Sequence, residues 1–245
     1  MSGENEIQGA ASFDAVADLY APARPSYPRE SVDWLVGDAS AVIDVGAGTG
    51  AFTGLLIAPG RTVVAIEPSQ RMLDVLRSAL PGTSAVNGSG ERMPLPDASA
   101  DAITFAQAWH WVDVRAASAE AARVLRPGGT LGLVWNLRDE RVGWVRELGV
   151  AMRADGDHYR GVDDDPSVDA PFGPPERSYV EWVQPSSRPA ILDMVRSRSY
   201  FALLSETEQA ATLAAVEGVL DRHAETTGET IPLPYVTASF RYLRP

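Results

Sequence analysis

Short apolar runs alternate with amphipathic segments along the first half of the chain. Five apolar runs bounded by turn residues predict buried strands over residues 41–45, 61–66, 84–86, 101–107 and 130–135. The segments between them predict helices over residues 51–57, 70–80 and 114–125. Ser69 is the expected N-cap of the second helix, and Pro127-Gly128-Gly129 is the expected stop of the third. Alternating strands and helices are typical of parallel βαβ units in an α/β fold.

The second half of the chain follows a different pattern. Residues 155–175 are rich in Asp, Gly and Pro and predict a long loop. Helices are expected over residues 142–152, 189–197 and 206–224, and strands over residues 179–183 and 231–243. We expect a single domain over residues 1–245, with an N-terminal arm over residues 1–30 and an insertion near the active site over residues 137–178.

Composition narrows the class of protein. The chain has 245 residues, of which 45% are apolar, enough to bury a large core. It has no cysteine, and its three histidines show no metal-ligand spacing, so we expect no disulfide and no bound metal. A net charge of −12 opposes contact with phosphate backbones, so nucleic acid is not an expected partner. Neither a membrane span nor a signal peptide is predicted, and we expect a cytoplasmic protein.

A glycine-rich turn follows the first predicted strand, in the run Asp44-Val-Gly-Ala-Gly-Thr-Gly50. Glycine lets a ligand approach the backbone closely, and the helix that follows presents N–H groups to it. Gly46, Gly48 and Ala51 also satisfy the relaxed dinucleotide pattern, so an NAD-linked oxidoreductase is an alternative. Asp44 argues against it, because a carboxylate there would repel a pyrophosphate. Glu67 ends the second strand, where it could hold a ribose diol in either class of protein.

Four motifs in order carry a family resemblance. The glycine-rich run resembles the first motif of class I methyltransferases that use S-adenosylmethionine (SAM), and Glu67-Pro-Ser-Gln-Arg-Met72 resembles their second. Residues 88–96 followed by 101–105 are similar to the family's adenine loop and fourth strand. Arg123-Val-Leu-Arg-Pro-Gly-Gly129 resembles the turn before the fifth strand. The resemblance implies a seven-stranded, mostly parallel sheet with an antiparallel last strand and helices on both faces.

A narrower resemblance covers almost the whole chain. Phe13, Tyr20, Arg24-Pro25 and Tyr27-Pro28 are similar to the N-terminal signature of the methyltransferase type 11 group, which includes trans-aconitate methyltransferase-like proteins. The run Ala106-Gln-Ala-Trp-His-Trp111 fits the same group, as do Trp135-Asn136, Arg198-Ser-Tyr200 and Pro234-Tyr235.

The resemblance implies SAM as methyl donor, with S-adenosylhomocysteine as its product. The implied cofactor-binding residues are Tyr20, Arg24, Asp44, Gly46, Gly48, Gly50, Glu67, Pro68, Met72, Ser89, Gly90, Glu91 and Gln107. Ser89-Gly90 stands where Asp-Ala is frequent in the superfamily, which is a departure in the adenine loop. The N-terminal arm is expected to fold over the donor as a lid.

The acceptor is expected to be a small molecule. The trans-aconitate resemblance favours a carboxylate, with Arg138, Arg196 or Arg198 as its clamp. Trp109, His110, Trp111, Asn136 and Arg138 are the predicted pocket residues, and His110 is the candidate general base. A purely positioning role for His110 is the competing interpretation, and tryptophan pairs are more often core than pocket. A SAM-binding protein without turnover is the second alternative function.

Overall fold

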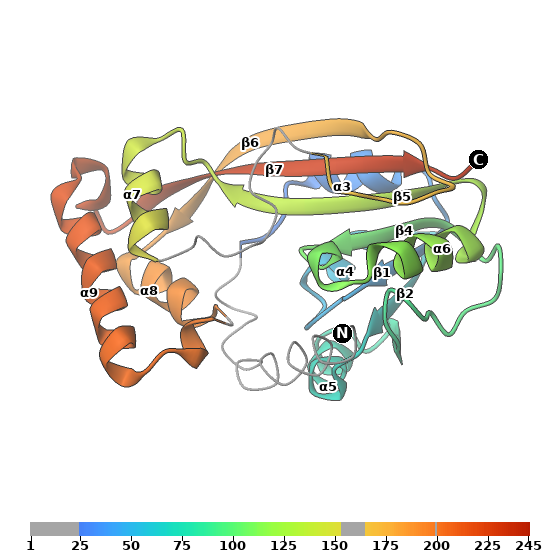
Figure 1. The fold of residues 1–245 in the computed structure, drawn as a ribbon, viewed down its shortest axis with the longest axis horizontal. Coiled ribbons are helices and arrows are strands. Elements are labelled where there is room, and N and C mark those ends of the chain that lie inside the picture. The colour runs from blue at the N-terminus through green and yellow to red at the C-terminus, as the bar shows by residue number, and fades with distance from the viewer. Residues whose placement is uncertain (1–24, 153–164, 199) are drawn as a thin grey trace.

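A seven-stranded sheet lies at the centre of the part of the chain that this computed structural model describes, residues 25–152, 165–198 and 200–245. Its strand order is β3-β2-β1-β4-β5-β7-β6 (Figure 1). The strands are β1 (Ala41–Val45), β2 (Thr62–Glu67), β3 (Ser84–Asn87), β4 (Ala100–Ala106), β5 (Leu125–Arg138), β6 (Glu176–Ser186) and β7 (Ile231–Leu243). β1 to β5 pair in parallel, and β7 is antiparallel to both β5 and β6. The predicted fold class is therefore confirmed.

Helices cover both faces of the parallel half of the sheet. α3 (Arg29–Val36), α4 (Ala51–Leu56) and α5 (Gln70–Ala79) pack on one face, and α6 (Val114–Val124) packs on the other. Successive residues of β1 belong to different cores, because side chains along a strand point alternately to the two faces. Val42 packs with α3 and α4, and Ile43 packs on the α6 side. Ser69 caps α5 as predicted, because its hydroxyl accepts the backbone N–H of Met72 at 3.2 Å.

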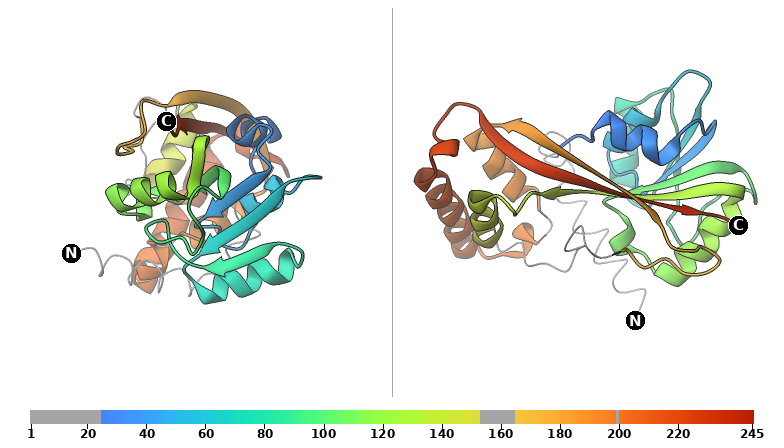
Figure 2. Two further views of the ribbon diagram at one scale, coloured as in Figure 1. Left: turned by 90° about the vertical axis from the view of Figure 1, so that its right-hand side faces the viewer. Right: turned by 90° about the horizontal axis from the view of Figure 1, so that it is seen from above.

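A second apolar core forms at the end of the long strands β5, β6 and β7 that extends beyond the parallel strands. α7 (Gly143–Ala151), α8 (Arg188–Arg196) and α9 (Glu206–Arg222) pack together with the first residues of β7. We call these three helices the cap. Ile231, Leu233 and Tyr235 of β7 belong to the cap core, whereas Ala238, Phe240 and Tyr242 of the same strand belong to the sheet core. Figure 2 shows the ribbon of β5, β7 and β6 running from the sheet to the cap.

Strand β5 is longer than predicted. Pro127-Gly128-Gly129 was expected to separate a helix from a strand that begins at residue 130, but the strand begins at Leu125. The Gly128 N–H donates to the Arg244 carbonyl at 3.0 Å, and the Arg244 N–H donates to the Gly129 carbonyl at 2.8 Å. Pairing with the chain end therefore continues the ladder through the turn residues, with a register shift against β4.

The ends of the predicted insertion, residues 137–178, belong to the sheet. β5 continues to Arg138 and β6 begins at Glu176. Between these strands lie α7 and, after the undescribed residues 153–164, a segment without helix or strand over residues 165–175. That segment packs beside α6, where the Asp169 N–H donates to the Ser118 hydroxyl at 3.0 Å. The predicted long loop is confirmed for this described part.

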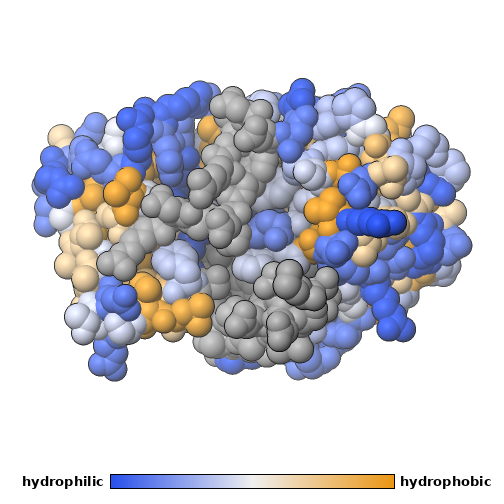
Figure 3. All heavy atoms as spheres, viewed as in Figure 1, coloured by the Kyte–Doolittle hydropathy of each residue, from blue (hydrophilic) through white to orange (hydrophobic). Residues whose placement is uncertain are grey.

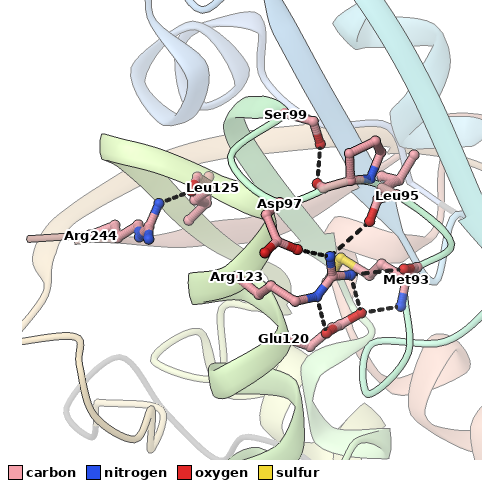
Figure 4. Close-up of polar contacts among 9 residues, drawn as sticks. Met93, Leu95, Asp97, Ser99, Glu120, Arg123, Leu125 and Arg244 are labelled. Carbon is pink, nitrogen blue, oxygen red and sulfur yellow. Dashed lines mark hydrogen bonds and ion pairs between the residues drawn. The ribbon is translucent and has the colours of Figure 1, made fainter.

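An arginine braces the connection between β3 and β4. The Arg123 guanidinium donates to the carbonyls of Met93 and Leu95 at 3.1 and 2.8 Å, and it pairs with Asp97 and Glu120 (Figure 4). Glu120 also accepts the Met93 N–H at 2.7 Å. α6 thereby fixes the loop that the sequence resemblance assigns to adenine.

The face seen in Figure 3 is mostly hydrophilic, and its apolar patches are small. This surface agrees with a net charge of −12. Among the described residues, we find no helix with the length and apolar character needed to cross a bilayer.

Candidate functional site

The glycine-rich turn joins β1 to α4 and has a backbone that glycine alone adopts without strain. Gly46, Gly48 and Gly50 have φ values of +67°, +56° and +91°. A Cβ on Gly46 would lie 2.6 Å from the Ala108 Cβ, and one on Gly50 would lie 2.9 Å from the Leu76 side chain. The turn is therefore held against the end of β4 and against α5, and both contacts require glycine.

Glu67 connects this turn to the end of β2. Its carboxylate accepts the Gly48 N–H and the Ser69 N–H, both at 2.9 Å. Each carboxylate oxygen can accept a further hydrogen bond, so the group is able to hold a ligand hydroxyl as well. Gly48 does not present its N–H to the cavity, because this carboxylate already accepts it. Sequence reasoning found Glu67 but did not find this bond to the turn.

Asp44 is a buried acid at the end of β1. It accepts hydrogen bonds from the Thr53 hydroxyl at 2.6 Å and the Thr104 hydroxyl at 3.1 Å. Burial raises the pKa of Asp44 to about 7, although the two threonine hydrogen bonds oppose the rise. The negative charge of Glu67 raises this pKa slightly further. Near neutral pH, Asp44 is therefore poised to change its charge when a cation approaches.

A cavity opens beside these groups. It is a small hollow that is partly open to solvent. The predicted residues that line it are Asp44, Gly46, Gly48, Gln107 and Asn136. Residues that prediction missed also line it: Pro25, Tyr27, Ala47, Thr49, Ala51, Phe52 and Ala106. Tyr27 was part of the N-terminal signature, and its ring meets Phe52 edge-on at 4.9 Å.

Other predicted cofactor residues lie outside this lining. Met72 is buried beside the turn, with its sulfur 3.9 Å from where a Gly48 Cβ would stand. Gly90 fits against Phe105, and Glu91 accepts the Asp113 N–H at 2.8 Å. The remaining members are Gly50, Glu67, Pro68 and Ser89. Tyr20 and Arg24 lie outside the described residues, so their predicted roles stay predictions.

Gln107 and Asn136 join the ends of β4 and β5. Gln107 has a positive φ of 55°, a strained backbone for a residue with a side chain. Its side-chain amide donates to the Asn136 carbonyl at 3.1 Å. The Asn136 amide donates to the Ser26 carbonyl at 3.0 Å and accepts from the Thr237 hydroxyl at 2.6 Å. This network ties residues 25–28, the described end of the arm, to the sheet.

The tryptophan–histidine–tryptophan triplet forms the 3₁₀ helix η1 (Trp109–Trp111), and its three side chains do not share one environment. Trp109 is 3% exposed, packs edge-on against Phe105 at 4.8 Å and donates to the Ser167 carbonyl at 2.9 Å. Trp109 therefore packs in the sheet core, and its predicted place in an acceptor pocket stays a prediction. Trp111 is 43% exposed.

His110, the candidate general base, contacts Trp135. Its Nδ1 accepts the Trp135 indole N–H at 3.4 Å, as the imidazole is oriented here. A neutral imidazole whose Nδ1 accepts carries its proton on Nε2, which can then donate a hydrogen bond. The general-base role and the competing positioning role both stay predictions.

Two comparisons with known proteins agree on one family. Residues 43–133 match the family model described as a methyltransferase domain. The chain is 48% identical to an uncharacterized methyltransferase of Mycobacterium tuberculosis (strain ATCC 25618 / H37Rv) over 232 residues, 94% of each protein. A malonyl-[acyl-carrier protein] O-methyltransferase of Methylococcus capsulatus is 42% identical over 96 residues, 37% of this chain and 35% of that protein.

A solved structure shows the same fold. The structure of "a Putative Type II Methyltransferase from Anaeromyxobacter dehalogenans" matches with a TM-score of 0.66 over 90% of this chain and 97% of that chain. At 22% sequence identity this likeness concerns the fold alone. The names of these relatives do not mention trans-aconitate, so that narrower assignment stays a prediction.

We predict that Asp44 makes the stability of the protein fall as pH rises from about 4 to 7. The folded pKa of about 7 lies above the unfolded value of 3.8, so the folded state keeps a proton that the unfolded state releases. Stability is lost at up to about 1.4 kcal/mol per pH unit over this window. Asp44→Asn should remove the loss, so its advantage over wild type should grow between pH 4.5 and 7.5 in urea unfolding.

Asp101→Asn provides the opposite control. Partial burial raises the pKa of Asp101, but hydrogen bonds from Ser40, Ala41 and Arg126 outweigh it and lower the pKa to about 2. Its charge therefore stabilises the fold at neutral pH, and Asp101→Asn should lose stability at pH 7.5. A stability difference between Asp44→Asn and wild type that does not change with pH would contradict the assignment.

Proposed function

Because the chain belongs to the class I SAM-dependent methyltransferases, we propose that it transfers the methyl group of SAM to a small-molecule acceptor at the cavity beside β1, β4 and β5. The observation that carries the proposal is the combination of a glycine cradle with a buried acid. Gly46 and Gly48 line the cavity without side chains, and Asp44 lines it next to them. A cationic, amino-acid-bearing ligand suits such a site.

These residues fit SAM. When bound, SAM supplies a methyl group on a positively charged sulfur, which reacts without a covalent enzyme intermediate. Asp44 would favour the positive charges of the ligand, and the ligand would in turn favour the ionised form of Asp44. Glu67 would accept a ribose hydroxyl while it holds the turn in place. The protein's own contribution is to orient the reactants and exclude water.

We further propose a carboxylate as the methylated group. The malonyl-[acyl-carrier protein] O-methyltransferase named above acts on a malonyl group, which carries a carboxylate. A new bond from the methyl carbon to a carboxylate oxygen forms as the bond from that carbon to sulfur breaks, which leaves an ester and a neutral thioether. A carboxylate is already ionised at pH 7, so no general base is required. His110 as a donor at Nε2 is compatible with this chemistry.

The NAD-linked alternative is less well supported. A pyrophosphate on the glycine turn needs free N–H donors, but Glu67 occupies the N–H of Gly48. The buried carboxyl of Asp44 also stands at the cavity, where a phosphate would be repelled once that group ionises. A SAM-binding protein without turnover has the same donor site as the enzyme, and only an activity measurement separates the two.

Glu67→Gln should weaken binding of S-adenosylhomocysteine about ten- to a hundredfold in calorimetry, because a charge-assisted hydrogen bond contributes about 1.5–3 kcal/mol. Glu217→Gln, an exposed acid on α9, should leave the affinity unchanged. NAD should not bind either protein. Wild-type affinity in the Glu67 variant, or binding of NAD without S-adenosylhomocysteine, would refute the donor assignment.

We also propose that the N-terminal arm closes over the donor. Asn136 holds the Ser26 carbonyl, so Asn136→Ala should speed amide exchange at Ser26 and Tyr27. Added S-adenosylhomocysteine should slow exchange across the arm in the wild type. Gln184→Ala, which alters a side-chain bond on edge strand β6, should exchange like the wild type in the arm. Equal arm exchange with and without the ligand would argue against a lid.

Transfer of radiolabel from methyl-labelled SAM to a panel of small acids and neutral metabolites tests the reaction. We expect label in a base-labile ester with at least one carboxylate. Transfer only to neutral acceptors would refute the carboxylate proposal, and binding of SAM without any transfer would favour the non-catalytic alternative.

A companion variant tests His110. With a carboxylate acceptor, His110→Gln should keep turnover within about tenfold of wild type and preserve the shape of the pH profile, because glutamine retains a donor. Loss of about 10²–10⁴ in kcat together with loss of an ionisation would restore the general-base role.

A further inference from the structure

Arg138 ends β5 in an unusual environment for a charged residue. It lies two residues beyond Asn136, so both side chains project from the same face of the strand, and Asn136 lines the cavity. Its Nε is buried, and no hydrogen-bond partner for that atom exists among the described residues. A buried guanidinium nitrogen without an acceptor is costly, so such a group is usually paired.

A second arginine with a charge close to Tyr200 comes from the segment after α8. Arg198 follows α8, and the Arg198 and Arg138 charges both act on the phenol of Tyr200. Burial raises the pKa of Tyr200, and these two positive charges oppose the rise. The Tyr200 hydroxyl is itself held in place, because it donates to the Met152 carbonyl after α7 at 2.5 Å. One arginine at the end of β5 and one that follows α8 are therefore both close enough to influence the Tyr200 phenol.

In the part of the chain that the structure describes, the acids close to Arg138 in sequence and on α8 pair with other arginines. Asp139 follows it directly in the chain, but the carboxylate of Asp139 accepts two hydrogen bonds from the Arg141 guanidinium, both at 2.7 Å. Arg141 also pairs with Glu181 at 2.6 Å. On α8, Asp193 pairs with the exposed Arg196 at 2.8 Å. Among the described residues no acid pairs with Arg138, so this guanidinium keeps its positive charge in a chain with a net charge of −12.

We infer that Arg138 forms an anion-binding subsite at the end of β5, beside the cavity, where it holds a negatively charged group of the acceptor. The inference rests on the proposed function for the meaning of "acceptor", but the subsite is testable without methyl transfer. A carboxylate and a phosphate share the chemistry that a guanidinium fork recognises. Arg196, which sequence reasoning treated as equal to Arg198, is excluded from the subsite by its exposed pair with Asp193.

The test is calorimetric titration of the full chain, loaded with S-adenosylhomocysteine, with malonate and separately with inorganic phosphate. We expect one of these anions to bind the wild type and to bind Arg138→Gln at least tenfold more weakly. Arg196→Gln removes the same charge from the neighbouring helix and should bind like the wild type. The anion that binds more tightly identifies the acceptor group as a carboxylate or a phosphate.

Arg138→Met separates binding from folding. It keeps the aliphatic packing and removes the unpartnered guanidinium, so its melting temperature without anion should equal or exceed that of the wild type. The wild type should melt higher with added anion, and Arg138→Met should show no such rise. A lower melting temperature in Arg138→Met would make Arg138 a structural residue and overturn the inference.

The remaining outcomes are also decisive. Absence of binding by either anion, equal binding by Arg138→Gln and wild type, or an equal loss in Arg196→Gln would each overturn the subsite. Failure of the wild type to bind S-adenosylhomocysteine would refute the donor proposal instead, and this is measured before any anion is added.

Discussion

The antiparallel ladder between β5 and β7 is the constraint on which the rest of the structure depends. β7 runs from Ile231 in the cap core to Tyr242 in the sheet core, so one extended strand belongs to both. Its pairing with β5 extends from Thr130 to Arg138. β7 also pairs with β6, so the two cores are joined through one continuous strand that is paired on both sides. Cavity residue Asn136 and Arg138 both lie on this ladder.

Burial affects the ionisable groups near this junction as strongly as neighbouring charges do. On the sheet side, a buried carboxyl at Asp44 has a pKa near 7, and threonine hydroxyls hold it. At the other side of the junction, the charges of Arg138 and Arg198 act on the half-buried Tyr200. With the proposed anion subsite at Arg138, a buried acid and an arginine would serve a cationic donor and an anionic acceptor separately.

Local signals predicted the strands well because the parallel half of the sheet is continuously apolar. β1 and β7 begin and end where periodicity placed them, and the Ser69 cap was recognised from its residue type. The predicted strand at β5 was too short, because Pro127-Gly128-Gly129 is locally a stop signal. Backbone pairing with the distant Arg244 overrides that signal. The core contact of Trp109 was not predicted for a similar reason, since the Ser167 carbonyl that receives its indole N–H is 58 positions away. The bond between Asn136 and Ser26 spans 110 positions, and no local pattern predicts such a contact.

The hydrogen-bond relay through Thr237 has a consequence for how this enzyme tolerates change. The Trp182 indole on edge strand β6 donates to the Thr237 hydroxyl, which donates to Asn136, which in turn holds the arm. Side chains alternate between faces along a strand, so a one-residue slip of β7 would turn Thr237 away from Asn136 and also reverse Leu233 and Tyr235 in the cap. The register of β7 therefore determines the packing of the cap and the attachment of the arm together. Insertions are better accommodated in the connection at residues 165–175 than anywhere along β6 and β7.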